Sequence, residues 1–438
     1  MKFRSGTRRR LVGKEFEPED VKLVLERLES AVPHLHFSPW GARAHKKTKG
    51  HDPDELPIGE GLWKGNRRTE IEVILNLRAL RLGSLCKRDA GALSEDDYEF
   101  LIGLADEAAR LVDASLTGAM SLFEYGTSAV AEDIRRRARL EFDPLGAIRF
   151  IRALSQDTYE NQRISYGLIL SKKHDGRDSF AMGFDNKRLK RLTDGFSTAL
   201  TLDSEGRLSD YVCLTPPKNE GVRASRRPWW IAGLAERADG LTGIGIALLR
   251  SGEMLVVHRK RMLYSLRSGQ WRVWNHAAIL ARLVGAWKSG GPRRQLERVL
   301  VYLYHVALDL SFRRSGGLLV VVPDESRASE LVMSKTDMVR GTSRGVAEKA
   351  LDRRLASTKI HRMDRRLIAD LASLDGALIA SRNGRVLAYG AMTKSAGGKR
   401  QGARTRAAIA SSGRGIAIKV SSDGTISLYA ARRCVMEL

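Results

Sequence analysis

The spacing of apolar residues changes along the first half of the chain from a helical period to an alternating one. The helical period predicts a helix from Glu19 to about Ala31 and further helices over about 69–82 and 95–122. Apolar and polar residues then alternate over 163–172 and over 198–214, which predicts strands, the second folded at a Ser-Glu-Gly turn. These elements predict a mixed α/β region.

The second half contains three segments of one shape. Each has an alternating apolar strand, a short polar turn that ends in glycine, and a returning strand, as a β-hairpin requires. They run over Gly243–Val257, Gly376–Tyr389 and Gly415–Tyr429. Three such hairpins favour a mixed sheet.

Helical periods lie between these hairpins. A wide apolar stripe predicts a helix over about 293–313, and the all-apolar run 318–322 predicts a central strand buried on both faces. Shorter helices are predicted over 345–355, 365–373 and from Arg404 to about Ser411. The fold class predicted for this region is α/β, with a mixed central sheet flanked by helices.

Composition limits the kinds of partner. The chain has 438 residues, with 75 Lys and Arg against 51 Asp and Glu, for a formal net charge of +24, which attracts polyanions such as nucleotides and nucleic acid. The basic runs 135–137 and 187–191 are interpreted as solvated helix faces, with a nucleic-acid contact as the alternative. No apolar run is long enough to cross a bilayer, so no membrane partner is expected. Only three cysteines occur, which favours a reducing, cytoplasmic location.

Two segments near the C-terminus carry candidate chemistry. Asp375 lies where a predicted helix meets a predicted strand, and its carboxylate suits a divalent metal. The stretch 397–406 has four basic residues and three glycines and leads into a helix N-terminus, which is a natural anion site. Together they suit a nucleoside triphosphate. Taken alone, each also fits a plain turn or a basic loop.

The last 145 or so residues resemble the diadenylate cyclase (DAC) domain family. Four segments match its motifs in order: a Gly-Gly-led apolar strand, an Asp-Gly-Ala motif, a Gly-x-Arg-x-Arg-Ala-Ala motif and a closing hairpin. In this chain they begin at Gly316, Asp375, Gly402 and Ile418.

The resemblance implies a homodimer that joins two ATP molecules into cyclic di-AMP with Mg²⁺ or Mn²⁺. Asp375 would hold the metal and act in catalysis together with Arg404 and Arg406. The remaining nucleotide-binding residues would be Gly376, Ala377, Gly402, Thr405, Ser421 and Ser422.

The resemblance also suggests how the chain is divided. It implies a DAC-like nucleotide-binding domain at 291–438, preceded by a sensor or regulatory region at 15–235. The residue pattern itself predicts a connecting β-hairpin region at 236–290 and a flexible basic arm at 1–14. Related bacterial signalling proteins carry such upstream regions.

Three positions depart from the family pattern. Ala403, Thr405 and Ser422 replace a threonine, a histidine and a glutamate, and each change is expected to weaken triphosphate or metal binding by about one polar contact. The leading hypothesis is a divergent diadenylate cyclase. The alternatives are an inactive DAC-like nucleotide sensor and a basic nucleic-acid-binding protein.

Overall fold

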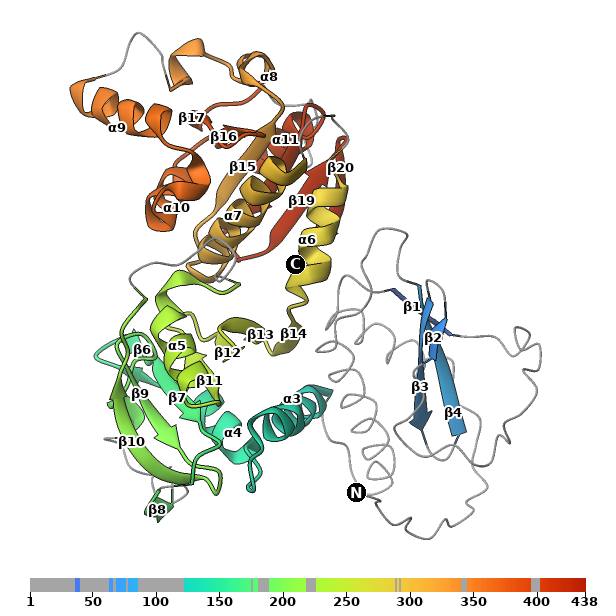
Figure 1. Ribbon diagram of the computed structural model, residues 1–438, viewed down its shortest axis with the longest axis vertical. Helices are drawn as coiled ribbons and strands as arrows, with labels where there is room; N and C mark the ends of the chain where they lie inside the picture. The colour runs from blue at the N-terminus through green and yellow to red at the C-terminus, as the bar shows by residue number, and fades with distance from the viewer. Residues whose placement is uncertain are drawn as a thin grey trace.

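The computed structural model describes most of the chain after residue 121 and four strands before it (Figure 1). The described residues are 36–39, 63–65, 68–75, 78–85, 122–174, 176–179, 189–217, 226–287, 290, 293–339, 345–394 and 402–438. The predicted basic arm, the helix predicted over 19–31 and nearly all of that predicted over 95–122 lie outside them.

The four early strands form an antiparallel sheet in the order β1-β4-β3-β2. They are β1 His36–Pro39, β2 Trp63–Gly65, β3 Arg68–Leu75 and β4 Arg78–Leu85. The helix predicted over 69–82 is therefore wrong. Ile71 and Val73 alternate with Glu70 and Glu72, as a strand requires, and β-branched side chains favour strands over helices.

An eight-stranded sheet follows, in the order β14-β13-β12-β11-β7-β9-β10-β8, and is called the first lobe together with its helices (residues 122–273). Its strands are β7 Tyr166–Leu170, β8 Asp178–Ser179, β9 Thr198–Leu202, β10 Arg207–Cys213, β11 Ile244–Leu248, β12 Met254–His258, β13 Arg261–Arg267 and β14 Gln270–Val273. The strands predicted over 163–172 and 198–214 are confirmed. A separate small hairpin pairs β5 Thr158–Tyr159 with β6 Gln162–Arg163.

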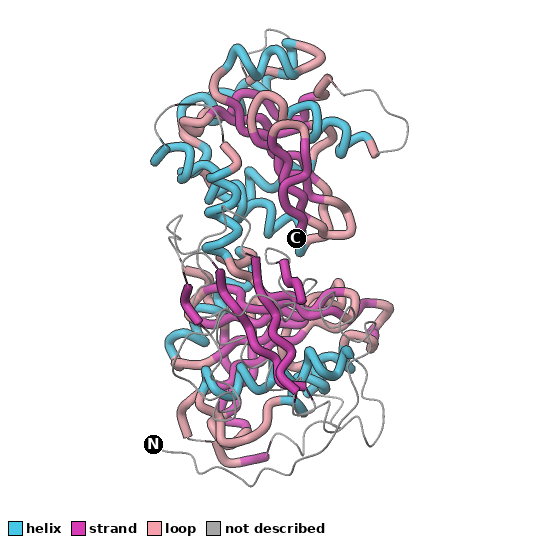
Figure 2. The backbone as a smooth tube through the Cα atoms, turned by 90° about the vertical axis from the view of Figure 1, so that its right-hand side faces the viewer, coloured by secondary structure: helices cyan, strands magenta, loops and turns pink. Residues whose placement is uncertain are grey.

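A six-stranded sheet in the order β17-β16-β15-β18-β19-β20 forms the second lobe (residues 293–438). Its strands are β15 Gly317–Val322, β16 Ala377–Ser381, β17 Val386–Ala391, β18 Ile416–Val420, β19 Ile426–Ala430 and β20 Arg433–Glu437. The three predicted hairpins all form. However, the first belongs to the sheet of the first lobe, because a hairpin pattern fixes local pairing and not the sheet that the hairpin joins. In Figure 2 the strands of the two lobes form two groups, one above the other.

Helices cover both large sheets, which confirms the α/β class. The α-helices are α3 Leu122–Ala138, α4 Leu145–Leu154, α5 Ala232–Gly240, α6 His276–Gly285, α7 Arg293–Phe312, α8 Glu325–Leu331, α9 Val346–Ser357, α10 Arg365–Ser373 and α11 Ala403–Ser411. Single 3₁₀ turns are η3 Leu189–Arg191, η4 Trp229–Ile231, η5 Lys335–Asp337 and η6 Ile360–Arg362. None of the described helices has the length and apolar character needed to cross a membrane.

Helix α7 lies in a core that both lobes share. It buries fourteen of its residues, from Leu296 to Phe312. One apolar cluster contains the apolar residues among these, together with Ile169 and Ala247 from one face of the first sheet and Leu319 and Ile418 from the second. The opposite face of the first sheet packs on α3 and α4, and that of the second packs on α8 and α11. The described lobes are therefore joined through a continuous core.

The two large sheets share one strand order. Strands β13-β12-β11-β7-β9-β10 correspond in order and direction to β20-β19-β18-β15-β16-β17. Each set has a single parallel pair, β7 with β9 and β15 with β16. Helices α5 and α11 occupy the same place in the chain order. Helix α5 directly precedes β11, which pairs antiparallel with β7, and α11 directly precedes β18, which pairs antiparallel with β15. The described chain therefore contains one fold twice.

Details of the backbone repeat as well. The hairpins β12–β13 and β19–β20 each carry one register shift, and both are closed by two residues with positive φ. These are Arg259 and Lys260 (47° and 63°) in the first lobe and Ala431 and Arg432 (48° and 61°) in the second. The hairpins β9–β10 and β16–β17 turn through Gly206 (81°) and Gly384 (89°), each followed by an arginine.

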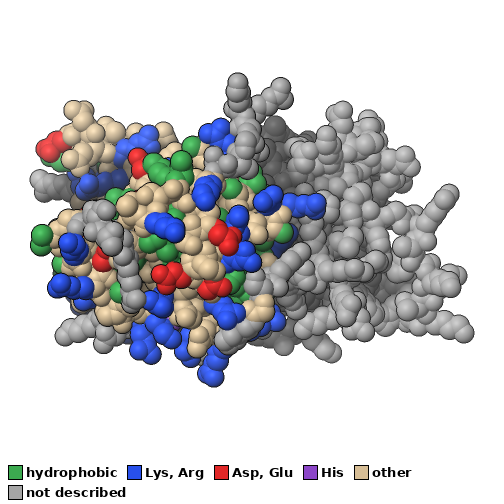
Figure 3. All heavy atoms as spheres, turned by 90° about the horizontal axis from the view of Figure 1, so that it is seen from above, with side chains coloured by type: hydrophobic (Ala, Val, Ile, Leu, Met, Phe, Trp, Pro, Cys, Tyr) green, Lys and Arg blue, Asp and Glu red, His purple; other side chains and the backbone are tan. Residues whose placement is uncertain are grey.

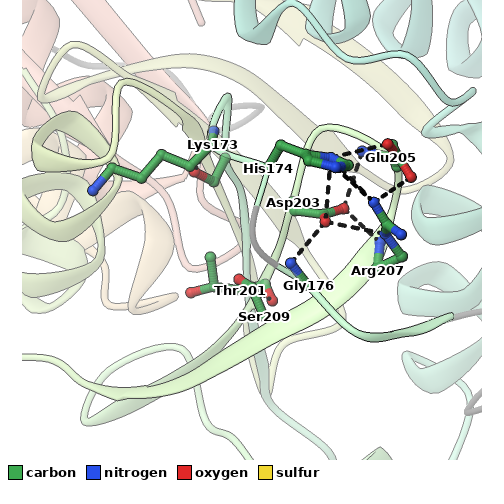
Figure 4. A network of polar contacts seen from close by, with 9 residues as sticks. Lys173, His174, Gly176, Thr201, Asp203, Glu205, Arg207 and Ser209 are labelled. Atoms are coloured by element: carbon green, nitrogen blue, oxygen red, sulfur yellow. Dashed lines mark hydrogen bonds and ion pairs between the residues drawn. The ribbon is translucent and has the colours of Figure 1, made fainter.

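Different side chains hold these equivalent turns. In the first lobe the buried Asp203 carboxylate accepts hydrogen bonds from the backbone nitrogens of Gly176, Glu205 and Arg207, and His174 lies beside Glu205 (Figure 4). Burial raises the pKa of Asp203, but these N–H donors outweigh it and hold the pKa below its usual value. In the second lobe, Ser381 accepts from the backbone nitrogen of Arg385 instead.

Candidate functional site

The second sheet brings the predicted site segments to one edge. Strands β15 and β16 run parallel, so both begin at this edge, whereas β18 is antiparallel to β15 and ends there. Gly317, the first residue of β15, pairs with Val420, the last residue of β18. Asp375 and Gly376 directly precede β16, and Ser421 directly follows β18. The topology therefore places residues separated by about a hundred positions at one sheet edge.

Asp375 and Arg404 meet at this edge. The Arg404 Nη2 lies 3.5 Å from the Asp375 Oδ1, with Asp375 92% and Arg404 39% exposed at the side chain. The guanidinium also lies against Gly316, where an added Cβ would come 2.4 Å from Nη1. An exposed carboxylate and a guanidinium therefore face solvent together, and both groups remain accessible to a ligand.

Gly376 has a backbone conformation that a side chain would obstruct. Its φ is +106°, and a Cβ would lie 2.5 Å from the carbonyl carbon of Gly390 and 2.7 Å from the nitrogen of Ala391. Ala377, the first residue of β16, is buried. These two residues therefore fix the backbone beside Asp375 and present no side chain to a ligand.

Helix α11 supplies the other predicted residues. It begins after Gly402, whose carbonyl accepts from the Arg406 backbone nitrogen at 3.1 Å. The Thr405 Oγ1 accepts from Lys419 Nζ at 3.3 Å, which ties α11 to β18. Arg406 is half-buried, unlike a residue of a solvated basic loop. The predicted helix from Arg404 to about Ser411 is confirmed.

Ser421 and Ser422 belong to the turn between β18 and β19. The Ser421 backbone nitrogen donates to the Thr425 carbonyl at 2.9 Å, and the Gly424 nitrogen donates to the Ser421 carbonyl at 2.9 Å. Ser421 is half-buried and Ser422 is exposed. Sequence reasoning missed Lys419, which contacts Thr405 of α11, and Arg267 and Arg314, which reach the β18–β19 turn from β13 and from the segment after α7. These contacts join segments far apart in the chain and leave no local signal.

The single carboxylate at this edge suits a metal ion that is held partly by the protein and partly by the phosphates of a bound nucleotide. Among the described residues, no group of three or more His, Cys, Asp or Glu side chains is arranged to hold a metal ion. Mg²⁺ is often bound through one or two carboxylates together with substrate phosphates. Asp375 fits this arrangement as a single carboxylate ligand, because its side chain is almost fully exposed and open to a metal bound to the nucleotide.

At the equivalent positions, the described residues of the first lobe do not carry these groups. Leu168 pairs with Leu200 as Leu319 pairs with Leu378, so Ser197 occupies the position of Asp375. At the same distance before the following strand, Ala232 and Leu234 occupy the positions of Arg404 and Arg406. The first lobe repeats the fold without the acid or the two arginines.

Several side chains of the basic runs considered for nucleic-acid binding form ion pairs with acidic side chains. On α3, the Arg135 Nε lies 2.7 Å from the Glu132 Oε2, and Arg137, only 7% exposed, pairs with Asp133. Lys190 pairs with Asp157 at 3.5 Å, and residues 187–188 lie outside the described residues. On the face shown in Figure 3, Lys and Arg side chains are spread out, with acidic side chains between them. Among the described residues of the two runs, Arg135, Arg137 and Lys190 therefore pair with acidic side chains.

Comparisons with known proteins give partial structural matches. No family model matches the chain, and no curated protein matches it by sequence. A hypothetical membrane spanning protein from Bacillus cereus matches 37% of this chain and 74% of its own, at 15% identity and a TM-score of 0.24. A double mutant of DacA from Staphylococcus aureus matches 33% of this chain and 87% of its own, at 17% identity and a TM-score of 0.20. Both TM-scores are below 0.5, so neither match bears on function.

Proposed function

We propose that this edge of the second lobe binds a nucleoside triphosphate and that the chain is a divergent diadenylate cyclase. The observation that carries the proposal is the meeting of Asp375 and Arg404, at 3.5 Å, beside the N-terminus of α11. A carboxylate for a metal, guanidinium forks for phosphates and a helix N-terminus are the groups that a triphosphate requires.

The proposed reaction joins two ATP molecules. The 3′-oxygen of each ATP forms a bond to the α-phosphorus of the other, the bond from that phosphorus to the pyrophosphate oxygen breaks, and the 3′-proton leaves to solvent. The products are cyclic di-AMP and two pyrophosphates. Bound Mg²⁺ or Mn²⁺ would neutralise charge on the phosphates.

The protein residues have separate roles in this proposal. Asp375 would hold the metal beside the 3′-hydroxyl. Arg404 and Arg406 would bind the phosphates and stabilise the charge that develops on the leaving pyrophosphate. Gly402 and the first turn of α11 would offer backbone N–H groups to the same phosphates, while Ser421 and Ser422 would contact the nucleotide from the neighbouring turn.

A second candidate is nucleotide binding without turnover. It is favoured by the Thr405 side chain, which already accepts from Lys419, and by the alanine at position 403. In that case the arginines would retain affinity for phosphate while fewer polar groups would be available for catalysis.

The test is to incubate the full chain with ATP and Mg²⁺ or Mn²⁺ and to identify products by mass spectrometry. Asp375→Asn is compared with Asp370→Asn, a matched change of an exposed carboxylate that pairs with Arg313 instead. We expect cyclic di-AMP from the wild type and from Asp370→Asn but not from Asp375→Asn. Nucleotide binding that Arg404→Ala abolishes, without product, would support the second candidate. Absence of both binding and product would refute both.

A further inference from the structure

Contacts from the first lobe reach the β18–β19 turn of the candidate site. Arg267, the last residue of β13, donates from Nη1 to the Gly424 carbonyl at 2.7 Å and from Nη2 to Ser311 Oγ at 3.0 Å. Ser311 Oγ also donates to the Gly424 carbonyl. The guanidinium therefore joins β13, helix α7 and the turn that carries Ser421 and Ser422.

A buried carboxylate holds this guanidinium in place. Glu253, 2% exposed at the side chain, pairs through Oε1 with the Arg267 Nε, and its Oε2 accepts from Ser251 Oγ at 2.8 Å. The same Oε1 lies 3.0 Å from Arg314 Nη2, and Arg314 also donates to the Asp423 carbonyl. Two arginines thus connect one carboxylate of the first lobe to two adjacent carbonyls of the turn.

The turn is shaped to receive Arg267. Gly424 has a φ of +86°, and an added Cβ would lie 2.6 Å from Arg267 Nη1 and 2.8 Å from the Ser311 carbonyl oxygen. Arg267 is only 16% exposed at the side chain, and its guanidinium carbon lies 4.8 Å from the centre of the Phe312 ring. The contact is therefore a packed one, in which hydrogen bonds are far less screened by water than at the surface.

The two turns that this contact joins are equivalents in the repeated fold. Glu253 follows the β11–β12 turn at Gly252, which corresponds to Gly424 of the β18–β19 turn. In the second lobe this turn bears the serines of the candidate site, whereas the first lobe has Leu249 and Arg250 at those positions. Glu253, next to the β11–β12 turn, thus holds the arginine that binds the equivalent β18–β19 turn.

We propose that Arg267, held by Glu253, is a positioning residue for the Ser421–Ser422 turn and couples the first lobe to nucleotide binding at the second. The inference rests on the proposed function for its effect on binding, but the positioning of the turn can be measured without a nucleotide. A shift in the position of strands β11–β14 would then move the Arg267 guanidinium and, through it, the Ser421–Ser422 turn of the candidate site.

The test compares Arg267→Lys with Arg313→Lys in the full chain. Lysine keeps a positive charge beside Glu253, so the fold is retained, but its single nitrogen cannot hold Glu253, Ser311 and Gly424 together. Arg313 is a matched control because it is exposed and pairs with Asp370. Two quantities are measured: hydrogen exchange of the amides in residues 420–428, and affinity for α,β-methylene-ATP with Mg²⁺. Thermal unfolding verifies that each variant is folded.

We expect faster amide exchange in the turn and about tenfold weaker nucleotide binding for Arg267→Lys, and no change in either for Arg313→Lys. Glu253→Gln should change both quantities in the same direction, because it releases the guanidinium. A purely structural role would lower the unfolding temperature without a selective change at 420–428.

Unchanged exchange at the turn in folded Arg267→Lys would overturn the proposal. Faster exchange with unchanged affinity would also overturn it, because the position of the turn would then not matter to the site. If the wild-type chain binds no nucleotide, the proposed function fails, and the exchange data alone then decide whether Arg267 positions the turn.

Discussion

At the scale of single residues, the candidate site depends on a backbone that glycine adopts readily and other residues do not. Gly376 combines a φ of +106° with backbone atoms of Gly390 and Ala391 within 2.7 Å of where a Cβ would be. Neither atom can move without disturbing the pairing of β16 with β17. The position of Asp375 at the sheet edge therefore depends on its neighbour having no side chain.

We predict that Gly376→Ala destabilises the protein by about 3 kcal/mol, because strained backbone and close contact add together. The free energy of unfolding in urea measures this. The matched control is Gly146→Ala: this exposed glycine lies within α4, and apart from its chain neighbours and the backbone of its own helix, no atom lies within 4 Å of an added Cβ. There alanine should stabilise by about 0.5–1 kcal/mol. Equal effects at the two positions would contradict the argument.

His276 is a second residue whose surroundings determine its chemistry. Its Nε2 lies 2.8 Å from the Met262 carbonyl, which can only accept, so Nε2 carries the proton and Nδ1 accepts from the Tyr304 hydroxyl at 2.8 Å. Burial lowers the pKa of His276 to about 3, and the charges of Arg226 and Arg261 act in the same direction against the Met262 hydrogen bond. The folded protein therefore keeps this imidazole neutral.

A pH dependence of stability follows. Between the unfolded-state pKa of about 6.5 and the folded-state value of about 3, only the unfolded chain binds this proton, so the free energy of unfolding falls as the pH is lowered. We expect a loss of about 2 kcal/mol between pH 7 and pH 5 from this histidine. Urea unfolding at both values measures it, and His276→Gln should reduce the slope. An unchanged slope in the variant would refute the assignment.

At the scale of elements, the sequence predicted what local patterns determine. The turns at Gly252, Gly384 and Gly424 were identified because glycine at positive φ and alternating flanks are local signals. Over 69–82 the helical period competes with an alternating one, and β3 forms where β-branched residues recur and pairs with β4. Local patterns did not show which sheet each hairpin joins.

Contacts between elements rest on groups that local patterns do not reveal. Asp309 of α7 is fully buried and accepts from the Trp229 backbone nitrogen at 3.0 Å and from Arg365 Nη2 at 2.6 Å. It thereby joins η4, α7 and α10. Because these residues lie far apart in the chain, no local sequence pattern indicates that Asp309 pairs with Arg365.

We predict that Asp309→Ala destabilises the fold by about 3–5 kcal/mol, because it removes the carboxylate from a largely buried guanidinium. The midpoint of urea unfolding measures the loss. Asp370→Asn is the control, since its partner Arg313 is 38% exposed and surface pairs contribute about 1 kcal/mol or less. A loss at Asp309 no larger than that at Asp370 would show that the buried pair does not join these elements.

At the scale of the whole molecule, the repeat of the fold was the feature least visible in the sequence. The three predicted hairpins look alike in sequence, but only the first and the third, β11–β12 and β18–β19, are equivalent in the repeat. The second, β16–β17, corresponds to β9–β10, and only the strand order shows this. The candidate residues Asp375 and Arg404 were identified from their own motifs. That they lie 3.5 Å apart required the pairing of β15 with both β16 and β18.

The asymmetry between the lobes predicts the binding stoichiometry. Because Ser197, Ala232 and Leu234 replace the acid and the arginines, we expect one nucleotide per chain and not two. Calorimetric titration with α,β-methylene-ATP measures the ratio. Arg404→Ala should abolish all of the binding, whereas Ala232→Ser in the first lobe should leave it intact. Two equivalents per chain, or residual binding in Arg404→Ala, would contradict the assignment.

The shared core around α7 has a consequence for how the lobes stay together. Two copies of a fold that meet as separate molecules come apart when the protein is diluted, because their association depends on concentration. Here both copies belong to one polypeptide, so each meets the other at an effective concentration set by the connecting chain. The support that Arg267 gives the β18–β19 turn should therefore be the same at nanomolar and at micromolar protein.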